Sequence, residues 1–260
     1  MTCACLLSVV IPAFALPENA PVPGGVAVIE VPADATSASF HGNPVMLLND
    51  AGKRYAVIGI PLSTVPGTAQ FTVGGNVHHF DVQPKAYKTQ RLTITNKRQV
   101  NPLPRDLKRI RRESRAIDAA LSQFDTSLPV HTAFATPAAG PISSPFGLRR
   151  VLNGEPRNPH SGIDIAAPFG ADIRSAAAGK VVATGDYFFD GKTVIVDHGQ
   201  GLATIYCHMS KILVKPGETV AAGQKLGEVG KTGRVTGPNL HWGVSLNNAR
   251  VDPDLFLKQH

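Results

Sequence analysis

Short runs of β-branched and apolar residues, interrupted by glycine and proline, recur through most of the chain. The sequence has 260 residues, of which 25 are Gly and 21 are Pro, and 43% are hydrophobic. Glycine and proline end regular elements and form turns, so this pattern favours a mainly β fold over a helical bundle. The hydrophobic content argues against global disorder. The expected strands are 26–31, 44–49, 54–60, 69–73, 179–185, 192–199, 202–210 and 241–246.

These runs form two groups, which predict two β-rich domains joined by one amphipathic basic helix. Residues 21–90 are expected to form a small β-sandwich-like accessory module. Residues 91–140 are expected to hold the helix and a linker, and 141–256 an antiparallel β-sheet domain with the functional site. The first module has no catalytic spacing, since adjacent strand residues such as His78 and His79 point to opposite faces.

The net charge of +7 is concentrated in one segment. Residues 91–115 contain nine Lys and Arg against two Asp and Glu, which equals the net charge of the whole chain. The basic residues are either a solvated helix face or a docking face for an anionic polymer of the cell wall or a membrane surface, and the sequence leaves both open. Apolar residues at helical spacing predict a helix over 104–124 whose buried stripe is Leu107, Ile110, Ile117, Leu121 and Phe124, with Ser114 filling the gap.

Residues 1–16 are typical of a secretory signal peptide. They hold a short apolar run and an Ala-Phe-Ala pattern that predicts cleavage after Ala15, although no Lys or Arg precedes the run. A buried N-terminal strand is the alternative. Cleavage removes Cys3 and Cys5 and leaves Cys207 without an internal partner. We expect a periplasmic or secreted protein, for which nucleic acid is not an expected partner. We expect no stable membrane insertion, because no other apolar run approaches about 18 residues.

The second β-rich segment carries the residues that suggest chemistry. His160 and Asp164 are separated by a Ser-Gly turn, so both side chains can converge on one metal ion. Asn239 and His241 point to the same face of a strand, and His208 ends another strand. Two imidazole nitrogens and one carboxylate oxygen leave a fourth zinc position for water.

The motifs HSGID, YCHMS, GxxTGPNLHWGV and FGLR resemble those of the lysostaphin/LytM-type zinc metallo-endopeptidases, over roughly residues 141–255. The N-terminal module resembles the accessory domain of some secreted members. The resemblance implies one zinc ion per chain, held by His160, Asp164 and His241. It also implies a monomeric hydrolase of peptidoglycan, acting on peptide cross-links or stem peptides through a metal-activated water. A periplasmic location favours D-Ala cross-links.

The resemblance also implies two further histidines beside the metal, and this chain matches only one of them. That residue is His208, whereas position 239 is Asn. An amide still donates a hydrogen bond but does not titrate near neutral pH, so Asn239 cannot replace an acid–base imidazole. Loss of such a group typically costs about 10²–10⁴ in rate. The sequence therefore indicates a weakened enzyme.

Two other functions remain to be weighed against a peptidase. The alternative is a catalytically weak or silent protein that binds the wall or activates another wall hydrolase. Silent relatives usually lose metal ligands, and all three positions are filled here. A biotinyl- or lipoyl-like carrier, suggested by the turn pattern at 214–229, is set aside because its exposed lysine tip is not evident.

Several neighbours of these motifs have predicted positions. Tyr206 is two residues before His208, so both are expected to line the site. Arg149 is expected either to bind a substrate carboxylate or to hold a structural ion pair. Trp242 and Cys207 alternate away from the site and are expected in the core.

Overall fold

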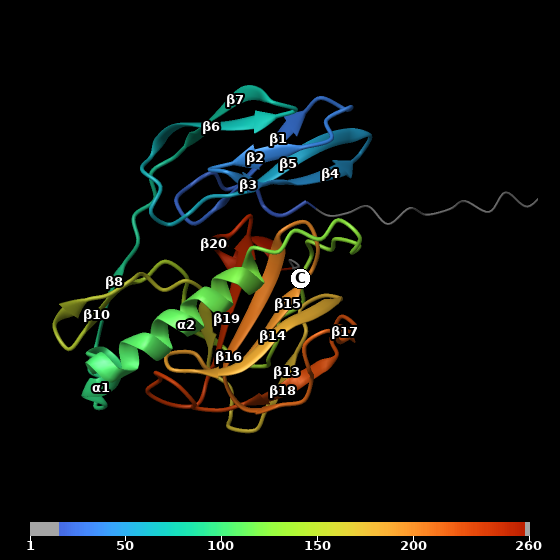
Figure 1. Cartoon of the computed structure of the whole chain (residues 1–260). Helices are drawn as coiled ribbons and strands as arrows, with labels where there is room; N and C mark the ends of the chain where they lie inside the picture. Colours follow the sequence, from blue (N-terminus) through green and yellow to red (C-terminus); the bar gives the residue numbers. More distant parts are fainter. Residues whose placement is uncertain (1–15, 258–260) are drawn as a thin grey trace, which may run out of the picture.

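The structure, a computed structural model, describes residues 16–257. The predicted signal peptide, its cleavage site and Cys3 and Cys5 lie outside the described residues. Figure 1 shows a β-rich region formed by the first strands, stacked on a second, larger β-rich region along which one long helix lies. The expected mainly β fold with two β-rich parts is confirmed. No helix among residues 16–257 is long and apolar enough to cross a membrane.

The N-terminal region consists of two small antiparallel sheets that share an apolar core. One sheet has the order β1-β5-β4 and the other β3-β2-β6-β7. Phe40, Ile58 and Phe71, one or more from each sheet, are at most 2% exposed. This is the expected sandwich-like arrangement. The strands are β1 (Val26–Val31), β2 (Ala38–Phe40), β3 (Asn43–Pro44), β4 (Met46–Asp50), β5 (Lys53–Gly59), β6 (Gly67–Val73) and β7 (Asn76–Val82).

The larger region is a ten-stranded sheet with the principal order β17-β14-β15-β16-β19-β12-β9. Its central strands β15, β16 and β19 are buried along most of their length because both of their faces are covered. The elements are β9 (Ile142–Ser144), β12 (Ile163–Ile165), β13 (Asp172–Arg174), β14 (Gly179–Tyr187), β15 (Gly191–Asp197), β16 (Leu202–Ile212), β17 (Thr219–Val220), β18 (Lys225–Val229), β19 (Leu240–Leu246), β20 (Ala249–Val251) and the 3-10 helix η1 (Pro253–Phe256).

The segment between the two regions is more ordered than a helix with a linker. Strand β8 (Thr89–Leu92) pairs in parallel with β10 (Arg149–Leu152), which pairs with β11 (Glu155–Pro156). The short helix α1 (Lys97–Val100) follows, and then α2 (Pro104–Leu121). The chain that leaves the N-terminal region is thus built into the wall of the C-terminal one.

Helix α2 packs on β14 and β15, and Ile117 and Leu121 of the expected stripe are buried, but the first part of the stripe is not. Leu107 is 40% exposed, whereas Asp106 and Glu113 are buried. Asp106 forms a hydrogen-bonded ion pair with Arg98. Glu113 accepts hydrogen bonds from Arg109 Nε at 2.6 Å and from the Phe188 amide at 2.8 Å. The predicted apolar stripe is wrong over the first two turns. The buried carboxylates of Asp106 and Glu113, with their arginine partners, dock this end of the helix, and Leu107 does not.

Candidate metal centre

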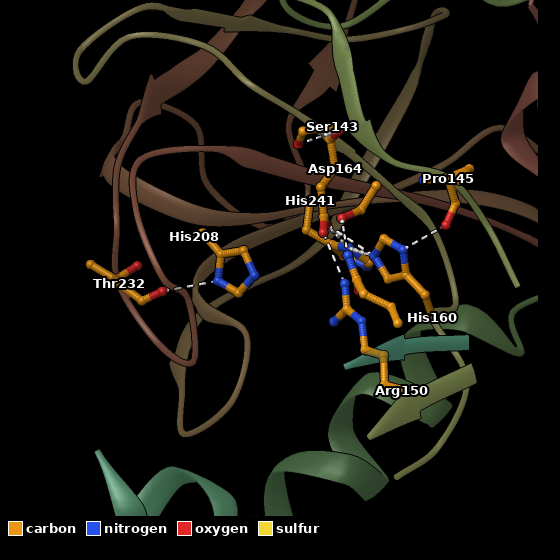
Figure 2. A network of polar contacts seen from close by, with 10 residues as sticks. Ser143, Pro145, Arg150, His160, Asp164, His208, Thr232 and His241 are labelled. Atoms are coloured by element: carbon orange, nitrogen blue, oxygen red, sulfur yellow. Dashed lines mark hydrogen bonds and ion pairs between the residues drawn. The ribbon is translucent and has the colours of Figure 1, made fainter. Parts of the chain in front are cut away.

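Three of the expected residues meet in one cluster. Asp164 on β12 lies directly opposite His241 on β19, and His160 precedes β12 by a turn. Asp164 Oδ1 lies 2.9 Å from His160 Nε2 and 2.9 Å from His241 Nδ1, and these two nitrogens are 2.9 Å apart (Figure 2). All three ligand atoms lie within 4.8 Å of one another. The strand register therefore produces the cluster that the motifs suggested.

The chemistry of this cluster fits a bound zinc ion. His160 is 1% exposed, and its Nδ1 lies 2.9 Å from the carbonyl oxygen of Pro145, so Nδ1–H donates there and Nε2 keeps its lone pair for the cluster. Burial lowers the pKa of His160, which keeps the imidazole neutral. Burial alone would raise the pKa of Asp164, but its close contacts with the imidazoles of His160 and His241 hold that pKa well below its usual range. A carboxylate and two imidazoles are donors that zinc prefers.

The second oxygen of Asp164 is held by an arginine that the sequence analysis missed. Arg150 Nη2 on β10 lies 2.9 Å from Asp164 Oδ2, and Ser143 Oγ donates to the Asp164 backbone carbonyl at 3.1 Å. Arg149 is exposed and lines a different groove, beside Tyr87 and Pro159, so it does not reach the cluster. Successive strand residues alternate in direction, and the FGLR motif marked the wrong one of the pair.

His208 approaches the cluster from the opposite side (Figure 2). Its Nδ1 donates to the Thr232 carbonyl at 2.9 Å, and its ring centroid is 6.0 Å from that of His241. His208 is 8% exposed, and burial, reinforced by the nearby His241, lowers its pKa to about 3. The imidazole is therefore neutral at pH 7, and its second nitrogen points toward the cluster.

A β-bulge explains why His208 lies here and Tyr206 does not. On β15 the single residue Thr193 faces both Cys207 and His208 of β16, and His208 has a positive φ of 66°. The extra residue breaks the alternation from which Tyr206 and His208 were expected to share a face. Tyr206 is 0% exposed, and its hydroxyl accepts from the Ala176 amide at 2.9 Å, so its predicted place in the site is wrong. Cys207 is buried as expected.

A cavity of about 260 Å³ opens beside the cluster. Asp164, His208 and Asn239 form part of its lining, and the Asn239 side-chain oxygen is buried without a hydrogen-bond partner in the described part of the chain. A water molecule or a ligand in the cavity would supply the missing partner of this amide atom. Trp242 lies in the core, as expected.

Other walls of the cavity come from segments that the motifs did not indicate. Gln90, Leu92 and Ile94 of β8 and the following turn form one wall, and Arg234 with its neighbours in the 231–236 loop forms another. Only the pairing of β8 with β10 brings the first group to the site, and a local pattern in the sequence does not encode such a contact.

Two histidines, one buried and one partly exposed, meet a carboxylate beside a cavity and are faced by a further buried imidazole. This is the donor set of metal-dependent hydrolases. Residues 158–253 match the model for peptidase family M23, and residues 19–85 match the model for the M23 N-terminal domain. A crystal structure from Pseudomonas aeruginosa assigned to peptidase M23 is 46% identical, with a TM-score of 0.77, over 92% of this chain and 95% of that one. The chain belongs to peptidase family M23.

Curated relatives match part of the chain. Peptidoglycan DD-endopeptidase ShyA of Vibrio cholerae is 45% identical over 112 residues, which are 43% of this chain and 26% of the relative. DD-carboxypeptidase/endopeptidase Mpg of Neisseria meningitidis serogroup B is 39% identical over 112 residues, again 43% of this chain and 26% of the relative. The match spans about a quarter of each curated relative. The family resemblance seen in the motifs is confirmed.

Proposed function

We propose that this chain is a zinc-dependent endopeptidase that hydrolyses peptide cross-links of peptidoglycan after export to the periplasm. Family membership supports a peptidase, and the names of the relatives support peptidoglycan as the substrate. The observation that carries the proposal is the buried cluster of His160, Asp164 and His241, open to a cavity faced by His208.

His160, Asp164 and His241 are the proposed ligands of one zinc ion per chain. A zinc ion bound there would polarise the scissile carbonyl and bring the pKa of a bound water toward about 7. The protein prepares the ligands for this task. The Pro145 carbonyl fixes the tautomer of His160, and Arg150 orients Asp164 so that Oδ1 faces the two imidazoles.

His208 is the proposed general base and acid. Its Nδ1–H is held by the Thr232 carbonyl, which leaves an unprotonated Nε2 facing the cavity. Nε2 takes a proton from the attacking water and returns it to the amine that leaves when the C–N bond breaks. The bulge on β16 is what presents this nitrogen to the substrate.

Asn239 is the proposed donor to the developing oxyanion. The unpartnered end of its amide lies at the cavity wall, and rotating the amide by half a turn places the NH2 group there. This group stabilises negative charge but exchanges no proton, so His208 alone carries the acid–base work. We infer a slower reaction than an imidazole at this position would allow.

A silent wall-binding protein is the second candidate function, and Asn239 is the observation that favours it. The two candidates differ in turnover and not in metal content, because both retain the three ligands. Purified protein should contain one zinc per chain and should release cross-linked stem peptides from purified sacculi, identified by mass spectrometry, with His160→Ala as the inactive control. Stoichiometric zinc without cleavage of any muropeptide would leave the silent function.

A further inference from the structure

Helix α2 presents a row of cations to solvent, which we call the basic ridge: Arg105, Lys108, Arg111, Arg112 and Arg115. All five side chains are exposed, and none of them takes part in a hydrogen bond or ion pair within the described residues. At about 100° per residue, the five occupy about one third of the helix circumference, opposite the buried face. From Arg105 to Arg115 the ridge is about 15 Å long.

The acidic residues of α2 do not neutralise this ridge, because the helix turns two of them inward. Asp106 pairs with Arg98 of α1, and Glu113 bonds Arg109 and the Phe188 amide. Both carboxylates therefore form contacts that hold the helix against the domain, and neither pairs with a cation of the ridge. Asp118, the third acidic residue of α2, is exposed and follows Arg115 by three residues, so the outward face carries five cations against one acid.

This arrangement destabilises the isolated protein. Lys108 has Arg111 and Arg112 one turn ahead, and Arg111 has Arg115 at i+4, where like charges repel. A binding polyanion would remove that repulsion. An interfacial membrane helix is a poor alternative, because it needs an exposed apolar face, whereas Ile117, Ala120 and Leu121 are buried on the domain.

The start of α2 lies close to the rim of the proposed catalytic cavity. Arg98 of α1 ties the start of α2 through Asp106, and Gln99 of α1 donates to the Gly233 carbonyl at 2.5 Å. The next residue, Arg234, lines the cavity. A polymer strand that leaves the cavity past this loop would reach the start of α2, which runs from α1 along the larger β-rich region (Figure 1).

We infer that the basic ridge of α2 is a docking surface for the free carboxylates of peptidoglycan stem peptides, holding the polymer beside the site where it is cut. This inference rests on the proposed function for the identity of the polymer. The ridge adds affinity for the insoluble, multivalent wall through exposed, salt-screened charges. It adds little for a soluble fragment that fills only the cavity.

The test compares a ridge variant, Lys108→Gln/Arg112→Gln/Arg115→Gln, with a control of equal charge change, Lys180→Gln/Lys211→Gln/Lys215→Gln. The control lysines are exposed and lie outside α2 and the cavity lining. Glutamine is a good helix former, so the ridge variant should fold and should melt at or slightly above the wild-type temperature. Binding is read by sedimentation with sacculi on ice, at low and high salt.

The ridge variant should bind sacculi roughly tenfold more weakly at low salt, and the control should match the wild type. Sacculi whose carboxyl groups are amidated should bind the wild type as weakly as intact sacculi bind the ridge variant. Equal sedimentation of all three proteins would overturn the inference, as would undiminished binding to amidated sacculi. Binding to phosphatidylglycerol vesicles but not to sacculi would also overturn it.

A second readout separates this inference from the proposed function. Cleavage of a soluble cross-linked muropeptide dimer should be the same for the wild type and the ridge variant, since the dimer does not span the ridge. A ridge-dependent loss of sacculus binding, with no cleavage by any of the proteins, would support the docking surface and refute the peptidase. Slower dimer cleavage by the ridge variant would refute a role confined to docking.

Discussion

Asn239 is the residue at which the proposed reaction depends most on a single side chain. An amide offers a hydrogen bond but no titratable proton, and the Asn239 oxygen is unpaired beside the cavity within the described residues. Asn239→His should raise kcat on cross-linked muropeptides by about 10²-fold, because a general acid–base group contributes about 10²–10⁴. Initial rates from mass-spectrometric muropeptide assays, at equal zinc content, measure the effect.

Asn239→Ala is the matched control for this substitution. It removes the oxyanion donor without adding a base, so kcat should fall further, by about 10-fold or more. Equal turnover of the wild type and Asn239→His would show that the amide already does all that this position contributes.

Arg150 acts on the cluster through Asp164 and is a positioning residue. Removing its guanidinium leaves Asp164 Oδ2 without its only ion-pair partner other than histidine in the described residues. Arg150→Ala should weaken zinc binding by about 10–100-fold, and Arg150→Lys should restore part of the loss. Competition with a chromophoric chelator measures affinity without reference to activity. Arg149→Ala, on the adjacent residue outside the cluster, should bind zinc as the wild type does, and an equal loss there would contradict this role.

His198, a buried histidine outside the site, is expected to make the free energy of unfolding depend on pH. Its Nδ1 donates to the Ala178 carbonyl at 2.7 Å, and full burial lowers its pKa to about 4. The unfolded chain therefore binds a proton that the folded chain refuses, so stability falls as pH drops from about 6.5 to 4. His198 should account for about 2–3 kcal/mol of that loss. Denaturant titrations should show a shallower pH dependence for His198→Gln than for the wild type, and equal pH dependence of the two proteins would contradict this role.

At the residue scale, the sequence predicted the metal cluster because its members belong to short motifs. His160 and Asp164 are four residues apart, and His241 is placed by a continuous strand. Tyr206 was misplaced because the prediction assumed unbroken alternation, whereas the bulge at His208 inserts one residue. Arg150 was missed because the sequence does not show which of two adjacent arginines faces the cluster. That depends on the orientation of β10, which its pairing with β8 sets.

At the scale of elements, α2 shows how buried charge can replace an apolar stripe. Glu113 is 9% exposed and holds both Arg109 and the amide of Phe188. Glu113→Gln should destabilise the protein by about 1–3 kcal/mol, because a buried charged acceptor of two bonds becomes a neutral one. Asp118→Asn, on the exposed side of the same helix, should change stability by less than about 0.5 kcal/mol. Equal effects in urea titrations would mean that Glu113 does not dock the helix.

Periodicity predicted the helix α2, but not that Asp106 and Glu113 lie on its buried face. A helix of 18 residues is identified by its pattern and by Pro104 at its start, and both are local properties. The inward turn of Asp106 and Glu113 depends on Arg98 and on the Phe188 amide, which belong to other elements. The same reason explains the missed strand β8, whose partner β10 is distant in sequence.

At the scale of the whole molecule, one face of the β1-β5-β4 sheet shares a core with the larger β-rich region, and its other face packs in the separate N-terminal core. Val26, Met46 and Val57 belong to the same buried cluster as Phe134, which lies outside the strands, and Trp242 of β19. Strand patterns predicted both regions, because each strand's alternation is local. The shared core could not be predicted, because a buried face of β1 or β5 does not reveal which surface covers it. The placement of β8 at the cavity wall follows from the same packing.

Asn247 joins the two regions by hydrogen bonds and tests how much that junction contributes. Its side chain accepts from the Gly59 amide at 2.5 Å and donates to the Gly59 carbonyl at 3.0 Å, and all of these groups are buried. Asn247 and Asn248 form the β19–β20 turn, both with positive φ, which glycine adopts without strain. Asn247→Gly should therefore keep the turn but leave Gly59 unpaired, lowering the free energy of unfolding by about 1–3 kcal/mol.

Asn248→Gly makes the same backbone change without losing a bond to Gly59, so its free energy of unfolding should stay within about 0.5 kcal/mol of the wild-type value. Chemical denaturation followed by tryptophan fluorescence reports on this junction, because Trp242 lies in the shared core. Coincident curves for the two variants would show that the core alone, without this amide, holds the regions together.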